Sequence, residues 1–236
     1  LNITLDSTSL AEKSDIQEFT KVILSNLDIW HKYKQKLYDN NIFKHDYKDT
    51  SRISINKCLV ESEELKLIYN ILNYLREKNE VEFIEDKDNI EVLFKNDYLK
   101  GFIFKSGTWL EVLTTLVVQS IEDIDEVKSG LTFYWGDDLK RVRNELDVVA
   151  IRDSVLICIS CKDSDKYDED ALNELQVYSE RLGGKNAIKI LVATKQPVKK
   201  TVLDRAKEMN INIVTLDKNI DIFKKALIDL IKKKTV

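Results

Sequence analysis

One acidic residue interrupts a long apolar segment that is expected to form a helix. Glu111 is the only charged residue in GTWLEVLTTLVVQSI, residues 107–121, where apolar residues fall on nearly every side of the helix. Burying an isolated carboxylate is costly unless a cation, a metal ion or a hydrogen-bond donor compensates for it. Glu111 is therefore a candidate site residue. The alternative is a glutamate at the rim of the helix whose carboxylate reaches water.

Two pairs of polar residues lie in predicted strands. In NELDVV, residues 144–149, Glu145 and Asp147 share one face, because successive side chains of a strand point to opposite faces. Two adjacent carboxylates repel each other, and a bound divalent cation is a common reason for such a pair. In the next strand the same alternation places Ser160 and Lys162 on one face. For both pairs the alternative is a strand position that simply meets water.

These residues suggest one kind of chemistry if the fold brings them to one edge of a sheet. Oxygen ligands suit Mg²⁺ or Mn²⁺. Such an ion can generate hydroxide and stabilise a pentacoordinate phosphorus, while a lysine positions the water or screens developing charge. The chemistry that this set predicts is hydrolysis of a phosphodiester bond.

A CxxC motif overlaps the second strand and offers a competing interpretation. Cys158 and Cys161 would face opposite sides of the sheet, whereas redox and zinc pairs usually sit on a turn or a helix N-terminus where both sulfurs converge. Zinc would also need further Cys or His ligands, which the chain hardly offers. We therefore expect neither a redox nor a zinc site here.

The elements that would position these residues follow an α/β pattern after residue 98. The sequence predicts, in order, a helix, three strands, a helix that ends at Gly183-Gly184, and then strand, helix, strand and helix. The predicted ranges are 107–121, 129–135, 144–151, 154–162, 169–182, 187–194, 199–209, 211–216 and from about 218. This alternation predicts a mixed sheet flanked by helices in a domain of residues 99–236.

Residues 1–98 do not show this alternation of strands and helices, and they are predicted to form a helical segment with one hairpin. Ser14-Asp15 could begin a helix that continues to Tyr38, and Ser62 is a plausible N-cap for a second helix. Two short strands follow at 81–86 and 89–94. Helices followed by a hairpin resemble a winged helix. A spacer or dimer surface is favoured over DNA binding for this segment.

The composition is that of an ordinary globular chain. With 236 residues, 43% of them hydrophobic and 33% charged, it can bury a real core in one large domain or two small ones. A net charge of −4 argues against binding nucleic acid through bulk positive charge, although a local basic groove remains possible. No apolar run is long enough to span a bilayer, and three cysteines form no disulfide framework. We expect a cytoplasmic protein with no membrane partner.

The order of Glu111, NELDVV, CISCK and ELQVYSERLGG resembles the PD-(D/E)xK nuclease superfamily over about residues 100–217. The segments YLKGFIFKSGTWLEV, NELDVV and LGGKNAIKILVAT are most similar to nuclease domains fused to CARF sensor domains in type III CRISPR antiviral systems. The resemblance implies a restriction-endonuclease-like fold and a homodimer that cuts DNA or RNA with little sequence specificity. It also implies that Asp147 is the central metal ligand, Lys162 the catalytic lysine and Glu111 the helix acid.

Two departures from this family leave alternatives open. The usual acid two residues before the lysine is Ser160, a much weaker ligand for a hard cation. Glu145 or Glu174 could supply the missing charge, and Gln176 stands where related nucleases often carry a glutamine. The alternative to an active Mg²⁺- or Mn²⁺-dependent nuclease is a decayed nuclease fold that binds nucleic acid.

The second departure is that nothing before residue 100 looks like a CARF sensor domain. We therefore expect the chain, which begins with Leu rather than Met, to be the C-terminal part of a longer protein, with a stand-alone nuclease as the alternative. A cyclic oligoadenylate would be a partner only if the full-length protein carries a sensor domain.

Overall fold

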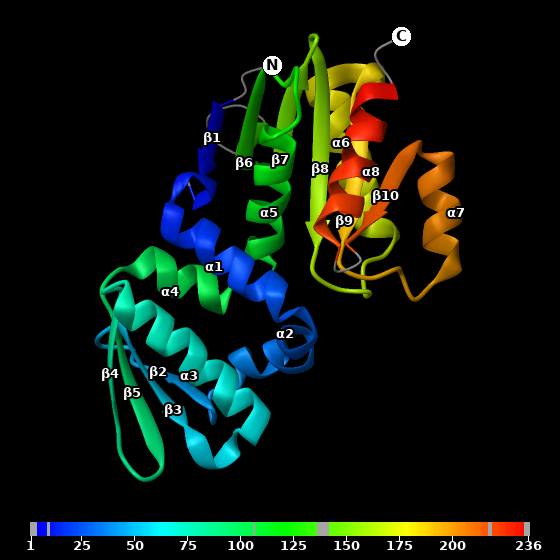
Figure 1. Cartoon of the computed structure of the whole chain (residues 1–236). Coiled ribbons are helices and arrows are strands. Elements are labelled where there is room, and N and C mark those ends of the chain that lie inside the picture. The colour runs from blue at the N-terminus through cyan, green and yellow to red at the C-terminus, as the bar shows by residue number, and fades with distance from the viewer. Residues whose placement is uncertain (1–3, 9, 106, 136–141, 217–218, 234–236) are drawn as a thin grey trace. The chain divides into compact units, whose positions relative to one another are not determined.

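The computed structural model of the chain divides into two compact units (Figure 1). It describes residues 1–236 except 1–3, 9, 106, 136–141, 217–218 and 234–236. One unit consists of residues 1–20 and 107–236, and the other of residues 21–106. This division differs from the predicted boundary after residue 98, because the first twenty residues join the C-terminal unit. The reason is a long-range strand pairing that local sequence patterns do not show.

The discontinuous unit is built on a six-stranded mixed sheet with the order β1-β6-β7-β8-β9-β10. Pairing is antiparallel from β1 to β8 and parallel from β8 to β10. The strands are β1 (Thr4–Thr8), β6 (Glu126–Trp135), β7 (Val142–Arg152), β8 (Val155–Lys162), β9 (Ile188–Ala193) and β10 (Ile211–Thr215). The predicted mixed sheet is confirmed, and β1 is the strand that the sequence did not predict.

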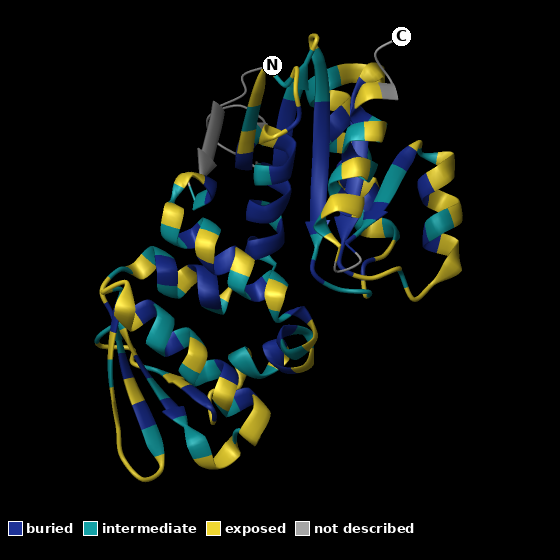
Figure 2. Ribbon diagram, viewed as in Figure 1, coloured by how far each residue is buried: buried dark blue, intermediate teal, exposed yellow. Residues whose placement is uncertain are grey.

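Helices cover both faces of this sheet (Figure 1). One face carries α5 (Thr108–Gln119) and α8 (Ile220–Lys233), and the other carries α6 (Glu169–Gly183) and α7 (Lys200–Glu208). Figure 2 shows that α5 is buried over most of its surface, as its apolar sequence predicts, whereas α7 is buried along one side only. A 3₁₀ turn, η4 (Gly184–Asn186), follows α6, and Gly184 caps that helix with φ +69° as predicted.

The sheet forks between β7 and β8. These two strands pair from Arg152 with Val155 up to Val148 with Ile159, and no further pair forms along the described length of either strand. Each continues with its other neighbour, β7 with β6 and β8 with β9 as far as Lys162 opposite Ala193. The fork leaves backbone groups of β7 and β8 without their expected ladder partners.

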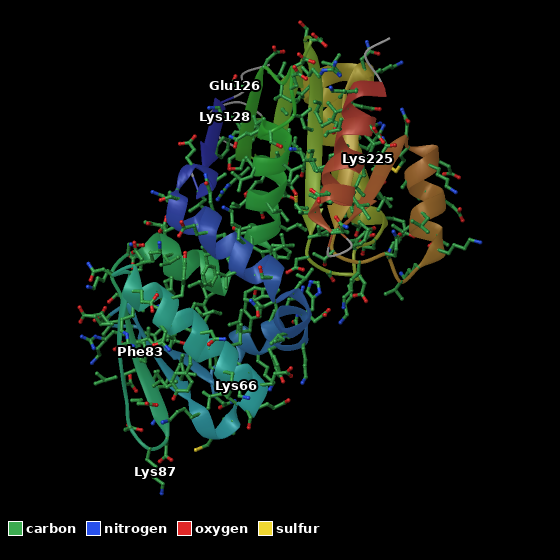
Figure 3. The ribbon with its side chains drawn as sticks, in the orientation of Figure 1. Lys66, Phe83, Lys87, Glu126, Lys128 and Lys225 are labelled. Carbon is green, nitrogen blue, oxygen red and sulfur yellow. The ribbon has the colours of Figure 1, made fainter. Side chains whose placement is uncertain are left out.

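The contiguous unit combines helices with a four-stranded antiparallel sheet in the order β2-β3-β5-β4. The predicted hairpin is present as β4 and β5, but it belongs to this larger sheet. Figure 3 labels Phe83 on β4, over whose ring Arg76 lies at 4.7 Å from the centroid. The strands are β2 (Phe43–His45), β3 (Arg52–Asn56), β4 (Val81–Glu85) and β5 (Asn89–Phe94). The winged-helix-like role of this segment stays a prediction.

The first predicted helix is broken at Asn26. The backbone N–H of Asn26 donates to the carbonyl of Ile23, three residues earlier, and its side-chain amide donates to the carbonyl of Val22. These bonds replace the regular α-helical bond to Val22, and the first helix ends there. The second predicted helix is present and begins at Ser62, with Glu61 and Glu64 forming a capping box. The helices are α1 (Ser14–Ser25), α2 (Leu27–Tyr33), α3 (Ser62–Glu77) and α4 (Asp97–Phe104), with 3₁₀ turns η1 (Leu10–Glu12), η2 (Lys34–Tyr38) and η3 (Lys57–Leu59).

Among the described residues no single helix is long and apolar enough to cross a membrane. By length and composition alone, α4 and α5 would pass that test only if they were taken together.

Candidate active site

Asp147 lies at the point where β7 and β8 separate. Its Oδ2 atom accepts a hydrogen bond from the backbone N–H of Cys161 at 2.6 Å and a second from the Ser160 hydroxyl at 3.2 Å. The Cys161 N–H would normally donate to a backbone carbonyl of the neighbouring strand, but the fork removes that partner. The carboxylate thus replaces the missing ladder bond, which fixes Asp147 against the end of β8.

Burial dominates the electrostatics of Asp147. It raises the pKa of this carboxyl, and the negative charge of Glu145 acts in the same direction. The Cys161 N–H, the positive charge of Lys162 and the Ser160 hydroxyl oppose the shift, but the net effect is a raised pKa. A partly buried carboxylate in this state gains from a nearby cation, because the cation compensates for the solvation that burial removed.

Glu111 approaches the same place from α5. The pKa of the Cys161 thiol is well above its usual value, because of burial first, then the negative charge of Asp147, then that of Glu111. Both carboxylates therefore lie near this thiol, whose sulfur is 3.6 Å from the Thr114 hydroxyl of α5. Glu111 is half-buried, in the first turn of α5. Glu111 on α5 and Asp147 on β7 thus both act on the Cys161 thiol, while the metal-ligand role of the two acids stays a prediction.

The two cysteines of the CxxC motif face opposite sides of the sheet, which confirms the prediction. Cys161 contacts α5, whereas Cys158 belongs to the core cluster that includes Leu172 and Leu175 of α6. Burial raises the pKa of Cys158 to about 11, so this thiol stays protonated at neutral pH. The positive charge of Lys162 acts on the Cys161 thiol and on Asp147, so this lysine lies near both.

The remaining predicted site residues are less central. Glu145 is close enough to influence Asp147, and its own carboxylate lies 3.7 Å from the Arg143 guanidinium. Glu174 is exposed on α6, and no described contact joins it to Asp147. The pKa of Tyr178 is raised by burial first and then by the negative charge of Glu174. Gln176 is not exposed; its side-chain oxygen accepts a hydrogen bond from Lys189.

Sequence reasoning missed two buried charged residues near these elements. Asp163 directly follows Lys162 and accepts hydrogen bonds from Trp109 and Thr194. Lys189 is buried on β9, which pairs with β8 on one side and β10 on the other. The signal that identified Glu111, a lone charge in an apolar segment, also marks Lys189 in AIKILVAT and could have found it.

The oxygen atoms at the fork suit a hydrated divalent cation rather than a complete protein cage. In the described part of the chain, no three His, Cys, Asp or Glu side chains converge as a metal-binding group. Mg²⁺, however, usually keeps several waters and takes only one or two carboxylates together with substrate phosphates. Asp147 and Glu111 meet that smaller requirement, and the raised pKa of Asp147 favours a cation beside it.

A family described as "Card1-like, endonuclease domain" matches residues 100–233, which is more than half of the chain and includes the whole fork. A search of curated proteins gives no match.

Solved structures share the fold at low sequence identity. The protein VC1899 from Vibrio cholerae matches with a TM-score of 0.72 and 19% identity over 98% of this chain. Can2 from Sulfobacillus thermosulfidooxidans, solved in complex with cyclic tetra-adenylate, matches with a TM-score of 0.60 and 17% identity over 97% of this chain. The chain spans 59% of the length of the first and 57% of the second.

Proposed function

The chain belongs to the Card1-like endonuclease domain family, and from this premise we propose that it hydrolyses phosphodiester bonds of DNA or RNA in a metal-dependent reaction with little sequence specificity. The observation that supports the proposal is the fork between β7 and β8, where Lys162 acts on Asp147 and where the charges of Asp147 and Glu111 both act on the Cys161 thiol. A partly buried carboxylate on which a lysine and a second acid act suits a site for a cation and a phosphate.

In this proposal Asp147 and Glu111 hold Mg²⁺ or Mn²⁺, and Glu145 adds negative charge nearby. The bound ion would supply an activated water and would neutralise charge that develops on the phosphate. Lys162 would orient the attacking water and stabilise the same charge, since an ammonium group carries three donors on a flexible stem. The Cys161 N–H and the Ser160 hydroxyl hold one oxygen of Asp147 in place.

Ser160 stands where related nucleases usually carry a third acid, and this changes how the proposed metal ion would be held. Its hydroxyl donates to Asp147 and adds no negative charge, so the proposed ion would be held less tightly and would depend more on substrate phosphates. Glu145 is the acid with an electrostatic effect on Asp147 and is the better candidate for additional charge. Glu174, exposed on α6, is the weaker one.

The biological setting follows from the relatives and is also proposed. Can2 binds cyclic tetra-adenylate, and both Can2 and VC1899 are longer than this chain. We propose a cytoplasmic effector associated with type III CRISPR defence that acts as a homodimer. A cyclic oligoadenylate would be its activator if a sensor domain accompanies this chain in the full-length protein.

The test is cleavage of supercoiled plasmid, single-stranded DNA and RNA during a Mn²⁺ titration. Wild type should cut at least one substrate, and Lys162→Ala and Asp147→Asn should each lower the rate by about a hundredfold or more. Two exposed residues near the ends of the same strands, Lys166 and Asp153, give the matched controls Lys166→Ala and Asp153→Asn. Both controls should cut like wild type.

Ser160→Glu extends the same experiment. A third carboxylate at the fork should lower the Mn²⁺ concentration that gives half-maximal cleavage. If wild type cuts no substrate at high protein concentration, or if the Lys162 and Asp147 variants cut as fast as wild type, the nuclease proposal is wrong.

A nucleic-acid-binding module is the second candidate function. The observations that favour it are Ser160 in the position of an acid and the lack of a three-ligand metal group among the described residues. In that case wild type would bind nucleic acid with an affinity that falls as salt rises, but it would not cut. Cleavage that appears only in Ser160→Glu would support this second candidate.

A further inference from the structure

Asp163 is a buried carboxylate that two other elements contact through hydrogen bonds. It lies directly after β8 and is 8% exposed. The indole N–H of Trp109 donates to its Oδ2 at 2.8 Å, and the Thr194 hydroxyl donates to its Oδ1 at 3.0 Å. Both carboxylate oxygens therefore have donors, which compensates for much of the cost of burying the charge.

The donors come from segments that carry or adjoin the proposed site. Trp109 is the second residue of α5, two positions before Glu111, and its side chain is 1% exposed. Thr194 directly follows β9, and its backbone N–H donates to the carbonyl of Lys162 at 3.2 Å. One carboxylate thus joins the beginning of α5 to the ends of β8 and β9.

The backbone approaches Asp163 closely at the entry to α5. Gly107 precedes the helix with φ +96°, a conformation that strongly favours glycine. A Cβ atom at this position would lie 3.9 Å from the Cβ of Asp163. The turn into α5 therefore lies beside Asp163, at ordinary van der Waals contact for an added Cβ atom.

We propose that Asp163 is a positioning residue that fixes Glu111 relative to Lys162. This inference rests on the proposed nuclease function. Asp163 is bonded directly to Lys162 along the chain, and a single residue separates Trp109 from Glu111, so the Trp109–Asp163 hydrogen bond ties the helix acid to the lysine. The Thr114–Cys161 contact, which also joins α5 and β8, is longer and involves a weak sulfur acceptor or donor. A misplacement of about 1 Å in a reacting group can cost on the order of a hundredfold in rate.

The test separates positioning from simple stabilisation. Trp109→Phe removes the indole donor and keeps an aromatic ring, and Asp163→Ala removes both acceptors. Asp163→Asn can keep both bonds, because its amide oxygen can accept from Trp109 while its amide nitrogen donates to the Thr194 hydroxyl. Tyr167→Phe is the control: it removes a hydroxyl that donates to the Lys195 carbonyl at 3.2 Å in the same unit, away from α5.

Three quantities are measured for each variant: kcat and KM on a labelled DNA or RNA substrate, Mn²⁺ affinity from the loss of the free-ion electron paramagnetic resonance signal, and the thermal unfolding midpoint. Trp109→Phe and Asp163→Ala should lower kcat by roughly tenfold or more, with KM within about twofold of wild type, and should weaken Mn²⁺ binding. Asp163→Asn should recover most of both. Tyr167→Phe should leave kcat and Mn²⁺ affinity unchanged, whatever its unfolding midpoint.

The outcome distinguishes this inference from the proposed function. If wild type cuts and binds Mn²⁺ but Trp109→Phe matches it in kcat and affinity, the nuclease proposal stands and the role of Asp163 is overturned. An equal loss in Tyr167→Phe would overturn it as well. If wild type binds Mn²⁺ without cutting, the nuclease proposal fails, and weaker Mn²⁺ binding in Trp109→Phe still supports Asp163. If wild type does neither, both are overturned. Should Asp163→Ala not fold, Trp109→Phe and Asp163→Asn carry the test.

Discussion

At the scale of single residues, burial at the fork makes the ionised form of Asp147 costly to the stability of the fold. The proposed chemistry uses the same ionised carboxylate to hold a metal ion. Asp147 is held by the Cys161 N–H and the Ser160 hydroxyl, yet burial still raises its pKa. Without a cation the folded protein therefore resists ionising this group. The same property would make the site favourable for Mg²⁺ or Mn²⁺, so stability and metal binding are linked through one carboxyl.

The pH dependence of stability follows from this raised pKa. Between the ordinary pKa of an aspartate and the raised value, the unfolded chain binds fewer protons than the folded one, so the free energy of unfolding falls as pH rises. We expect Asp147→Asn to unfold a few degrees above wild type at pH 7 in EDTA, since about 1 kcal/mol corresponds to roughly 2–4 °C at this chain length. The difference should shrink toward pH 4. The measurement is the thermal unfolding midpoint against pH.

The control for this prediction is Asp153→Asn, which changes an exposed aspartate just beyond the other end of β7. It should leave the pH profile of the unfolding midpoint unchanged. An Asp147→Asn variant that is less stable than wild type at pH 7 would mean that the hydrogen bonds at Oδ2 outweigh the cost of burial.

Residue types alone predict much of the candidate site. Glu111, Asp147 and Lys162 stand out because each is a charge in an apolar or β-branched segment, where burial is expected. Asp163 does not stand out, because it begins the polar run DSDKYDED and looks like part of a solvated loop. Its burial depends on Trp109, 54 positions earlier, and local patterns do not encode such a contact.

At the scale of elements, the end of α6 packs unusually close to β8. A Cβ atom on Gly183 would lie 2.7 Å from the Cβ of Leu156, a distance that real Cβ atoms essentially never show. The backbone of Gly183 has φ −117°, which any residue can adopt, so the requirement for glycine is steric. This close approach allows the apolar side of α6 to pack against β8, the strand that carries Ser160 and Lys162.

Gly183→Ala should therefore destabilise the protein by about 1–3 kcal/mol through overpacking. Gly101→Ala gives a control of opposite sign: Gly101 lies within α4, a Cβ there meets nothing within 4 Å, and alanine in a helix interior is favoured over glycine by roughly 0.5–1 kcal/mol. Denaturant unfolding of both variants measures the two effects. Equal stability of Gly183→Ala and wild type would show that α6 can shift at no cost.

Periodicity predicted the elements of residues 107–236 well, since every strand and helix expected there is present with its ends within three residues. The strands that it missed are short or depend on distant partners. Strand β2 has three residues, and β1 pairs with β6 more than a hundred positions later. The stabilisation of such strands comes from their partners, so no local window contains the signal.

At the scale of the whole molecule, the chain interrupts one unit with another. Strand β1 completes the edge of the sheet beside β6, while residues 21–106 between them form the contiguous unit. Figure 3 labels Glu126 and Lys128 at the beginning of β6, where their side chains form an ion pair at 3.3 Å. Charged side chains of this kind are common on sheet edges, but β1 is the backbone partner that covers β6.

Removal of residues 1–8 should expose the backbone of β6 and lower stability. We expect an unfolding midpoint lower by several degrees and concentration-dependent self-association, because a long uncovered edge strand pairs readily with other chains. Light scattering coupled to size-exclusion chromatography measures the association. A chain lacking only residues 1–3, which precede β1, is the control and should behave like wild type. An unchanged midpoint and mass for the larger deletion would show that β6 does not need this neighbour.

The pairing of β1 with β6 also has a consequence during translation. Strand β1 leaves the ribosome first, but its partner begins only at Glu126, so the two cannot meet until the intervening chain has been made. At about 5–20 residues per second this delay is on the order of ten seconds. All of residues 21–106 are synthesised within that interval. The contiguous unit can therefore fold on the nascent chain before most strands of the six-stranded sheet have been synthesised.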